Sequence, residues 1–316
     1  MADTLERRKI GSLDVSVVGL GCNNFGWRLD ADATRAVIDA ALEAGVDFFD
    51  TADVYAGGKA EEVMGRWMQG KDRRTLTIAT KCRWRMWPGP NGEGAGRKHV
   101  IDACHDSLRR LNTDYIDLYQ IHGPDRETPA EETLRALDEL VKAGKIRYFG
   151  WSNYSAEMIS ENTQLSESLG LNRAISLQNN YSMLLRSSEV RDNPRSVQEG
   201  LGLIPYSPLA QGLLSEKYLD GKAPTGSRAS DNEGLQKRLD QHLPTLRALA
   251  EIAQGRELTL SQLALAWLLH QPGMTAPIIG ASRPEQLREN AKASGVTLST
   301  EEMAKIAALL PAPDAK

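Results

Sequence analysis

A tyrosine, a lysine, an aspartate and a histidine form a set that suits the reduction of a carbonyl group. The reference pKa of tyrosine is about 10, too high for efficient proton exchange at neutral pH. A nearby ammonium group favours the phenolate and lowers that pKa, and Lys81 is the candidate cation for Tyr55. A buried lysine needs a carboxylate partner, which Asp50 can supply. A neutral His122 can orient a carbonyl oxygen, so Tyr55 is the predicted proton donor.

These side chains follow short apolar runs that alternate with amphipathic stretches. The runs are typical of strands that are buried on both faces, and they cover residues 17–19, 46–49, 76–80, 115–120, 146–150, 174–177, 202–205 and 277–279. Helical periodicity is clearest at residues 33–43, 130–142, 260–270, 284–293 and 300–309. The first of these helices has Asp32 in its predicted N-cap region and Gly45 as its stop signal.

Strand–helix alternation implies parallel strands joined by right-handed crossovers. Eight repeats favour an α/β fold of the (β/α)8 TIM barrel type over a doubly wound open sheet, which is the alternative. We expect one barrel domain over residues 1–316, with extra C-terminal helices and an N-terminal β-hairpin over residues 5–17. The hairpin turn is predicted at residues 11–12 or at Asp14. Loops 82–97 and 209–233 are long enough to be binding loops.

The carboxyl ends of barrel strands meet at one face, where barrel enzymes carry their chemistry. If the predicted strands are right, polar side chains from at least seven of them gather there. In chain order, the residues that follow the strands are Asp50, Tyr55, Lys81, His122, Ser152, Asn153, Gln178, Tyr206, Ser207, Gly280 and Ser282. No nucleophile–base pair is apparent among them, so the set suits carbonyl reduction better than hydrolysis.

Composition excludes several other classes of function. The net charge of −4 and the absence of a basic run give no reason to expect a nucleic-acid partner. No apolar run approaches the ~20 residues that span a membrane, and the charged amino terminus is not a secretory signal. Three widely spaced cysteines suit a reduced, cytoplasmic location. An oligomer is possible but is not indicated.

A metal-dependent barrel hydrolase is a weaker alternative. The chain has five histidines, and none of the cysteines forms a zinc pattern. His99 and His105 lie near one predicted helix, but at six residues apart they do not share a helical face well. We therefore expect no metal.

Several motifs together resemble the aldo-keto reductase superfamily, in particular its bacterial branch near the potassium-channel β-subunit-like reductases. The resemblance covers nearly the whole chain in the family's order. Its motifs are DFFDTADVY at 47–55 followed by Glu61, IATK at 78–81, QIH at 120–122, GWSN at 150–153, QNNY at 178–181, YSPL at 206–209 and IGAS at 279–282.

The resemblance implies an NADPH-dependent reductase of aldehydes or ketones, with Tyr55, Asp50, Lys81 and His122 as its catalytic residues. A small-molecule carbonyl compound is the implied substrate. Ser152, Asn153 and Gln178 would hold the nicotinamide carboxamide, and Tyr206 would stack on the ring. Other implied cofactor contacts are Ser207, Leu209, Gly212, Lys217, Arg228, Gly280, Ser282, Gln286, Glu289 and Asn290. Gly19-Leu20-Gly21 lacks the glycine spacing of a Rossmann fingerprint.

The sequence departs from the family pattern at some positions. Gly280 and Gln286 replace the basic residues that other reductases place around the 2′-phosphate, although Arg283 with Ser282 and Gln286 could still bind it. Ala56 replaces the usual Gly after Tyr55, and Ala60 replaces a common Ser.

An alternative within the family is a regulatory or redox-sensing subunit with little turnover. The channel-associated relatives typically carry Asn at the position of His122, so His122 favours an enzyme.

Three loop tryptophans are candidates for the substrate pocket. Trp27, Trp84 and Trp87 could form an apolar wall for the carbonyl compound. They could equally pack on the barrel rim or contact another subunit.

Overall fold

The computed structural model describes residues 5–224, 230 and 232–313, and an eight-stranded parallel sheet dominates it. The strands lie in the order β10-β3-β4-β5-β6-β7-β8-β9. They are β3 (Gly19–Gly21), β4 (Phe48–Asp50), β5 (Thr77–Cys82), β6 (Ile116–Ile121), β7 (Ile146–Ser152), β8 (Ser176–Gln178), β9 (Gly202–Leu203) and β10 (Ile278–Gly280).

The two ends of this sheet meet and close it into a barrel. The backbone nitrogen of Ile278 donates to the carbonyl of Pro205 at 2.8 Å, and that of Thr275 donates to the carbonyl of Leu203 at 2.9 Å. Tyr206 and Ile278 also form an isolated parallel bridge. The predicted (β/α)8 barrel is confirmed, and the doubly wound alternative is wrong.

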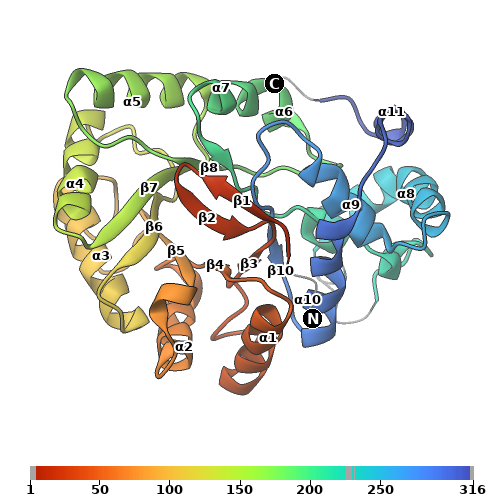
Figure 1. The fold of residues 1–316 in the computed structure, drawn as a ribbon, viewed down its shortest axis with the longest axis horizontal. Helices are drawn as coiled ribbons and strands as arrows, with labels where there is room; N and C mark the ends of the chain where they lie inside the picture. The colour runs from red at the N-terminus through yellow and green to blue at the C-terminus, as the bar shows by residue number, and fades with distance from the viewer. Residues whose placement is uncertain (1–4, 225–229, 231, 314–316) are drawn as a thin grey trace.

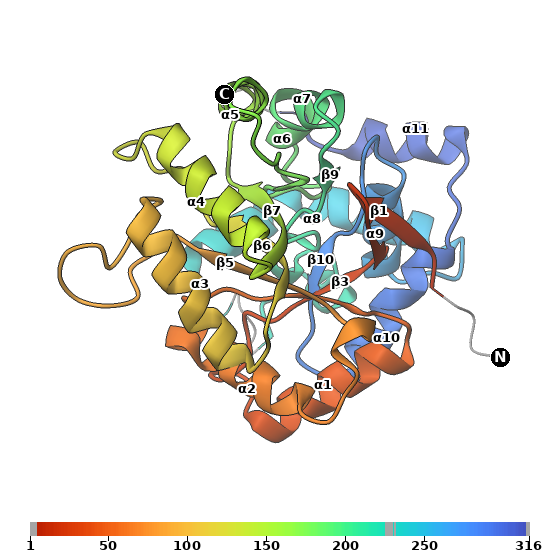
Figure 2. The same cartoon turned by 60° about the vertical axis from the view of Figure 1, so that its left-hand side comes forward.

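Helices alternate with the strands and surround the barrel (Figures 1 and 2). None of the described helices is long and apolar enough to cross a membrane. The helices are α1 (Ala31–Glu43), α2 (Lys59–Met68), α3 (Arg97–Leu111), α4 (Ala130–Lys142), α5 (Ala156–Ser168), α6 (Ser187–Arg191), α7 (Asn193–Gln198), α8 (Glu233–Gln254), α9 (Leu260–Leu269), α10 (Pro284–Ala291) and α11 (Thr300–Leu309).

The predicted element boundaries differ from the observed ones by up to about two residues. The first barrel strand is Gly19–Gly21 rather than 17–19. Strand β9 ends at Leu203 because Pro205 has no N–H to continue the ladder. Helix α1 begins two residues earlier than predicted, since Asp30 rather than Asp32 accepts the hydrogen bond from the Ala33 nitrogen, at 2.9 Å. Gly45 does end this helix, with φ of +83°.

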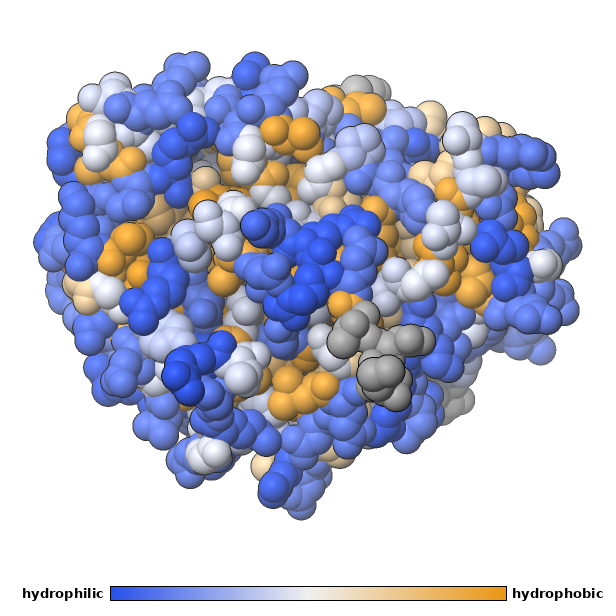
Figure 3. All heavy atoms as spheres, in the orientation of Figure 1, coloured by the Kyte–Doolittle hydropathy of each residue, from blue (hydrophilic) through white to orange (hydrophobic). Residues whose placement is uncertain are grey.

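The hairpin of β1 (Arg7–Ile10) and β2 (Leu13–Ser16) covers the amino end of the barrel. Its turn is at residues 11–12, not at Asp14. Ile10 and Val15 are buried against side chains inside the barrel, among them Phe48 and Leu118. The opposite face of the hairpin carries charged residues, and the middle of this side of the molecule is hydrophilic (Figure 3). Access to the barrel interior is therefore left to its carboxyl end.

Candidate active site

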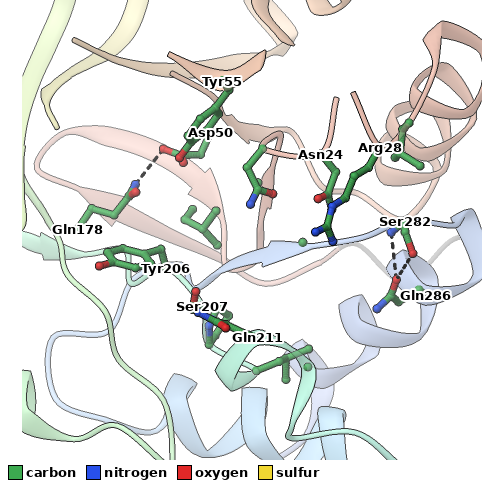
Figure 4. Close-up of a pocket in the computed structure, with 18 of the residues that line it drawn as sticks. Asn24, Arg28, Asp50, Tyr55, Gln178, Tyr206, Ser207, Gln211, Ser282 and Gln286 are labelled. Carbon is green, nitrogen blue, oxygen red and sulfur yellow. Dashed lines mark hydrogen bonds between the residues drawn. The ribbon is translucent and has the colours of Figure 1, made fainter. Parts of the chain in front are cut away.

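A cavity of about 600 Å³ lies at the carboxyl end of the barrel (Figure 4). Its walls come from the last residues of the strands and from the loops that follow them. All eight strands, β3 to β10, contribute to the lining through their last residues or the segments that follow them. The predicted site residues that line it are Asp50, Tyr55, Trp84, His122, Asn153, Gln178, Tyr206, Ser207, Leu209, Gly212, Lys217, Gly280, Ser282 and Gln286.

A buried ion pair lies at the base of the cavity. The ammonium of Lys81 donates to Asp50 Oδ2 at 2.6 Å and to the carbonyl of Thr51 at 2.8 Å. The side chain of Lys81 is 0% exposed and that of Asp50 is 3% exposed. Burial alone would lower the pKa of Lys81, but Asp50 and Tyr55 outweigh it and the pKa is raised. Lys81 is thus charged at neutral pH.

Asp50 also anchors two amides. Its Oδ1 accepts hydrogen bonds from Gln178 Nε2 at 2.8 Å and from Gln120 Nε2 at 3.2 Å. Three strands, β5, β6 and β8, therefore contribute donors to one carboxylate, and Figure 4 shows the Asp50–Gln178 bond at the end of the cavity where Tyr55 lies. This network fixes the orientation of Gln178, since a carboxylate can accept only from the amide nitrogen.

Tyr55 faces the cavity at the start of a short 3-10 turn, Tyr55–Gly58. Lys81 Nζ lies 5.2 Å from the centroid of its ring. Burial, the largest influence, raises the pKa of Tyr55, whereas Lys81 lowers it, and the net pKa is raised. The predicted net lowering of this pKa is therefore wrong, although Lys81 acts in the expected direction.

His122 lies beside Tyr55, with ring centroids 5.8 Å apart in an edge-to-face arrangement. Burial, and then the charge of Lys81, lower the pKa of His122 to about 3. The imidazole is therefore neutral in the physiological range. Its Nδ1 is buried and has no hydrogen-bond partner among the described residues.

The residues predicted to hold the carboxamide take different positions. Asn153 lines the cavity with φ of +62°, and its Oδ1 accepts a hydrogen bond from the Tyr206 hydroxyl at 3.0 Å. Ser152 is buried behind it and donates to the carbonyl of Gln178 at 2.9 Å. Gln178 keeps its Oε1 available toward the cavity, because its Nε2 is engaged with Asp50.

The other predicted cofactor residues are divided between the cavity wall and its surroundings. Gln286 Oε1 accepts from the Ser282 backbone nitrogen at 3.0 Å, and both residues line the end of the cavity away from Tyr55. Glu289 lies outside the lining and accepts a hydrogen bond from Gln262 Nε2 at 2.8 Å. Asn290 is buried, and its Nδ2 has no partner in the described part of the chain. Arg228 lies outside the described residues.

The three tryptophans do not form one wall. Trp84 lines the cavity, with its ring 6.3 Å from that of His122. Trp87 packs on His99, at 4.8 Å between ring centroids, and is not among the lining residues. Trp27 is 63% exposed and stacks on the guanidinium of Arg28, whose Cζ is 4.6 Å from the ring centroid.

Several lining residues were not predicted. Asn23, Asn24, Arg28 and Leu29 come from the loop between β3 and α1, and Gln211 comes from the loop after β9. Most of the predicted site residues stand at the end of a strand or just after it, whereas these residues lie further along their loops. The one sequence feature that could have indicated this loop is Arg28 itself, a basic residue shortly after the first barrel strand.

The fold and this site define a barrel oxidoreductase that places a tyrosine and a neutral histidine over a buried lysine–aspartate pair. Residues 17–311 match the Aldo/keto reductase family, and the chain belongs to it. It is an NAD(P)H-dependent oxidoreductase, and some of its relatives are named as reductases or oxidoreductases.

Three relatives illustrate the range of similarity. A "Probable voltage-gated potassium channel subunit beta" of Arabidopsis thaliana is 39% identical over 292 residues, covering 90% of this chain and 89% of that protein. An "L-glyceraldehyde 3-phosphate reductase" of Escherichia coli O157:H7 is 38% identical, covering 90% and 85%. "Protein tas" of Escherichia coli (strain K12) is 34% identical, covering 94% and 95%. The predicted family and its branch are confirmed.

Proposed function

We propose that the chain reduces an aldehyde or ketone to an alcohol with NADPH as the cofactor and Tyr55 as the proton donor. The observation that carries this proposal is the convergence of Tyr55 and His122 on one cavity, directly above the buried Lys81–Asp50 pair. A relative whose name states reduction of a phosphorylated aldehyde supports the reaction class.

The geometry suggests how the proton is supplied. A bound reduced nicotinamide would deliver hydride to the carbonyl carbon. The Tyr55 hydroxyl then gives its proton to the carbonyl oxygen, which completes the alcohol and leaves a phenolate. Lys81 stabilises that phenolate, and Asp50 keeps Lys81 charged. Neutral His122 donates an N–H to the same oxygen and orients it. Trp84 beside His122 would contact the rest of the substrate.

The cavity fits a dinucleotide. Its volume of about 600 Å³ falls within the range of small-molecule sites. Tyr206 presents an aromatic ring near the catalytic end, and Gln178 Oε1 and Asn153 could bind a carboxamide there. Ser282 and Gln286 lie at the opposite end and would hold the adenosine. The phosphate preference of arginine supports a role for Arg283 near the 2′-phosphate and hence NADPH.

A regulatory subunit with little turnover is the second candidate. The 39% identity with a plant protein named as a channel subunit favours it, whereas a complete set of Tyr55, Lys81, Asp50 and His122 favours an enzyme. A cytoplasmic location is part of the main proposal and is supported by three free, buried cysteines.

The test is cofactor titration followed by turnover with a panel of aldehydes and ketones. Tyr55→Phe should bind NADPH as tightly as the unmutated protein but lose roughly 100-fold or more in turnover, the usual contribution of a general acid. Tyr115→Phe is the matched control, because Tyr115 packs between Arg73 and Arg147 away from the cavity. Tight NADPH binding without consumption of the cofactor would favour the regulatory candidate. Retained turnover in Tyr55→Phe would refute the assigned proton donor.

A further inference from the structure

Arg28 is a cation in the cavity wall that the proposed chemistry does not use. It lines the cavity from the loop between β3 and α1, and it extends into it between Asn24 and Ser282 in the view of Figure 4. No carboxylate in the described part of the chain forms an ion pair with it. An arginine that faces a ligand cavity without an acidic partner has its hydrogen-bond donors available for an anion.

The loop that carries Arg28 is held in place. The Arg28 and Leu29 nitrogens both donate to the carbonyl of Asn24, at 3.1 and 3.0 Å, and the Gly26 nitrogen donates to the carbonyl of Leu29. Gly26 has φ of +77° and lies so close to Lys59 that a Cβ would be 2.8 Å from that side chain. The loop backbone is thus fixed against the start of α2.

Trp27 positions the guanidinium itself. Its indole nitrogen donates to the carbonyl of Asn23 at 2.8 Å, which anchors the ring. The guanidinium of Arg28 stacks on this ring at 4.6 Å. This contact gives the Trp27 ring a partner although the side chain is 63% exposed. Stacking leaves the edge of a guanidinium free to form hydrogen bonds.

A second cation enters the cavity from the loop after β9. Lys217 lines the cavity, and a Cβ at Gly212 would be 3.3 Å from its Nζ. No described carboxylate pairs with Lys217 either. Arg28 therefore comes from the loop after β3, and Lys217 comes from the loop after β9. In the closed barrel β10 lies between β3 and β9, so the two loops lie on either side of β10.

We propose that Arg28, stacked on Trp27, binds the diphosphate of the nicotinamide dinucleotide from the side opposite Lys217. This inference rests on the proposed function. With the nicotinamide at Tyr55 and Tyr206 and the adenosine at Ser282 and Gln286, the diphosphate falls in the middle of the cavity, where Arg28 reaches it. A planar guanidinium suits bidentate contact with phosphate oxygens.

The test compares NADPH with NADH by isothermal titration calorimetry. Arg28→Ala should weaken both nucleotides about tenfold or more and by nearly the same factor, because both carry the diphosphate. Arg28→Lys should recover part of the affinity, and Trp27→Ala should weaken binding in the same direction by a smaller factor. Arg35→Ala, an exposed arginine on α1, is the matched control and should change neither affinity.

Other outcomes would overturn the inference. A loss confined to NADPH would assign Arg28 to the 2′-phosphate. Unchanged cofactor affinity with a raised KM for the carbonyl compound would assign it to an anionic substrate. If neither the cofactor affinity nor the KM for the carbonyl compound changed, the inference about Arg28 would be refuted, but the proposed function would not. Failure of the unmutated protein to bind either nucleotide would instead refute the proposed function, and this inference with it.

Discussion

Replacement of Asp50 by Asn should destabilise the fold strongly, because it leaves the Lys81 ammonium buried with one carbonyl partner. Asp50 accepts three hydrogen bonds, from Lys81 at 2.6 Å, Gln178 at 2.8 Å and Gln120 at 3.2 Å. An Asn side chain has one oxygen, so either orientation turns an amide N–H₂ toward a donor. Removing one partner of a fully buried pair costs roughly 3–5 kcal/mol.

Urea unfolding, followed by tryptophan fluorescence and circular dichroism, measures this loss. With a denaturant dependence of about 3 kcal/mol per molar, the unfolding midpoint should fall by about 1 M or more. Asp72→Asn is the matched control, because the Arg74–Asp72 pair is 84% and 46% exposed and such pairs contribute roughly 0–1 kcal/mol.

A double variant separates the two causes of the loss. Asp50→Asn with Lys81→Met removes the unpaired charge, so it should recover much of the stability lost by Asp50→Asn while reductase activity stays lost. If Asp50→Asn were as mild as Asp72→Asn, or if the double variant were no more stable than the single one, the buried ion pair would not have the energetic role argued above.

Three further predictions concern titration and backbone strain. The turnover number for reduction should be flat between about pH 5 and 9, since His122 has a pKa of about 3 and the raised pKa of Tyr55 keeps its hydroxyl protonated; an inflection near pH 6.5 that disappears in His122→Gln would contradict this. Ala56 has φ of +51°, so Ala56→Gly should raise the free energy of unfolding by about 0.5–1 kcal/mol, whereas Ala60→Gly inside α2 should lower it by about 1 kcal/mol or more in the same urea assay. Burial, and then the charge of Glu61, raise the pKa of Asp53 to about 8, so the folded state holds a proton that the unfolded state releases above about pH 4. The free energy of unfolding should therefore fall as the pH rises from 4 to 8. Asp53→Asn should reduce that fall when unfolding is measured at both pH values.

The fold was predictable because each strand is a short apolar run that is buried on both faces. Such runs, separated by amphipathic helices, leave few alternatives to a parallel sheet with helices around it. The strand ends were less predictable, since they depend on partners far away in the chain. Pro205 illustrates this: it cannot extend β9, yet its carbonyl accepts one of the hydrogen bonds that close the barrel.

The candidate site was predictable where a side chain directly follows a strand, because the sheet itself then sets its position. Asp50, His122 and Gln178 are of this kind. Loop residues had no such constraint, so Arg28 was missed and Trp87 was expected near a cavity that it does not line. The net direction in which the pKa of Tyr55 is shifted could not be predicted from the sequence either. The cation beside it can be inferred from residue types, but the extent of burial depends on the packed structure.

Asp50 links the proton donor, Tyr55, to Gln178, which is proposed to bind the nicotinamide carboxamide. One of its oxygens holds the Lys81 ammonium that stabilises a Tyr55 phenolate, and the other holds Gln178 and Gln120. Because Gln178 Nε2 is engaged, its Oε1 is the atom left to accept from a carboxamide N–H₂. The carboxylate that sets the charge beneath Tyr55 therefore also sets which hydrogen bonds Gln178 can offer. A change at Asp50 should accordingly weaken cofactor binding as well as proton transfer, whereas a change at Tyr55 should affect proton transfer alone.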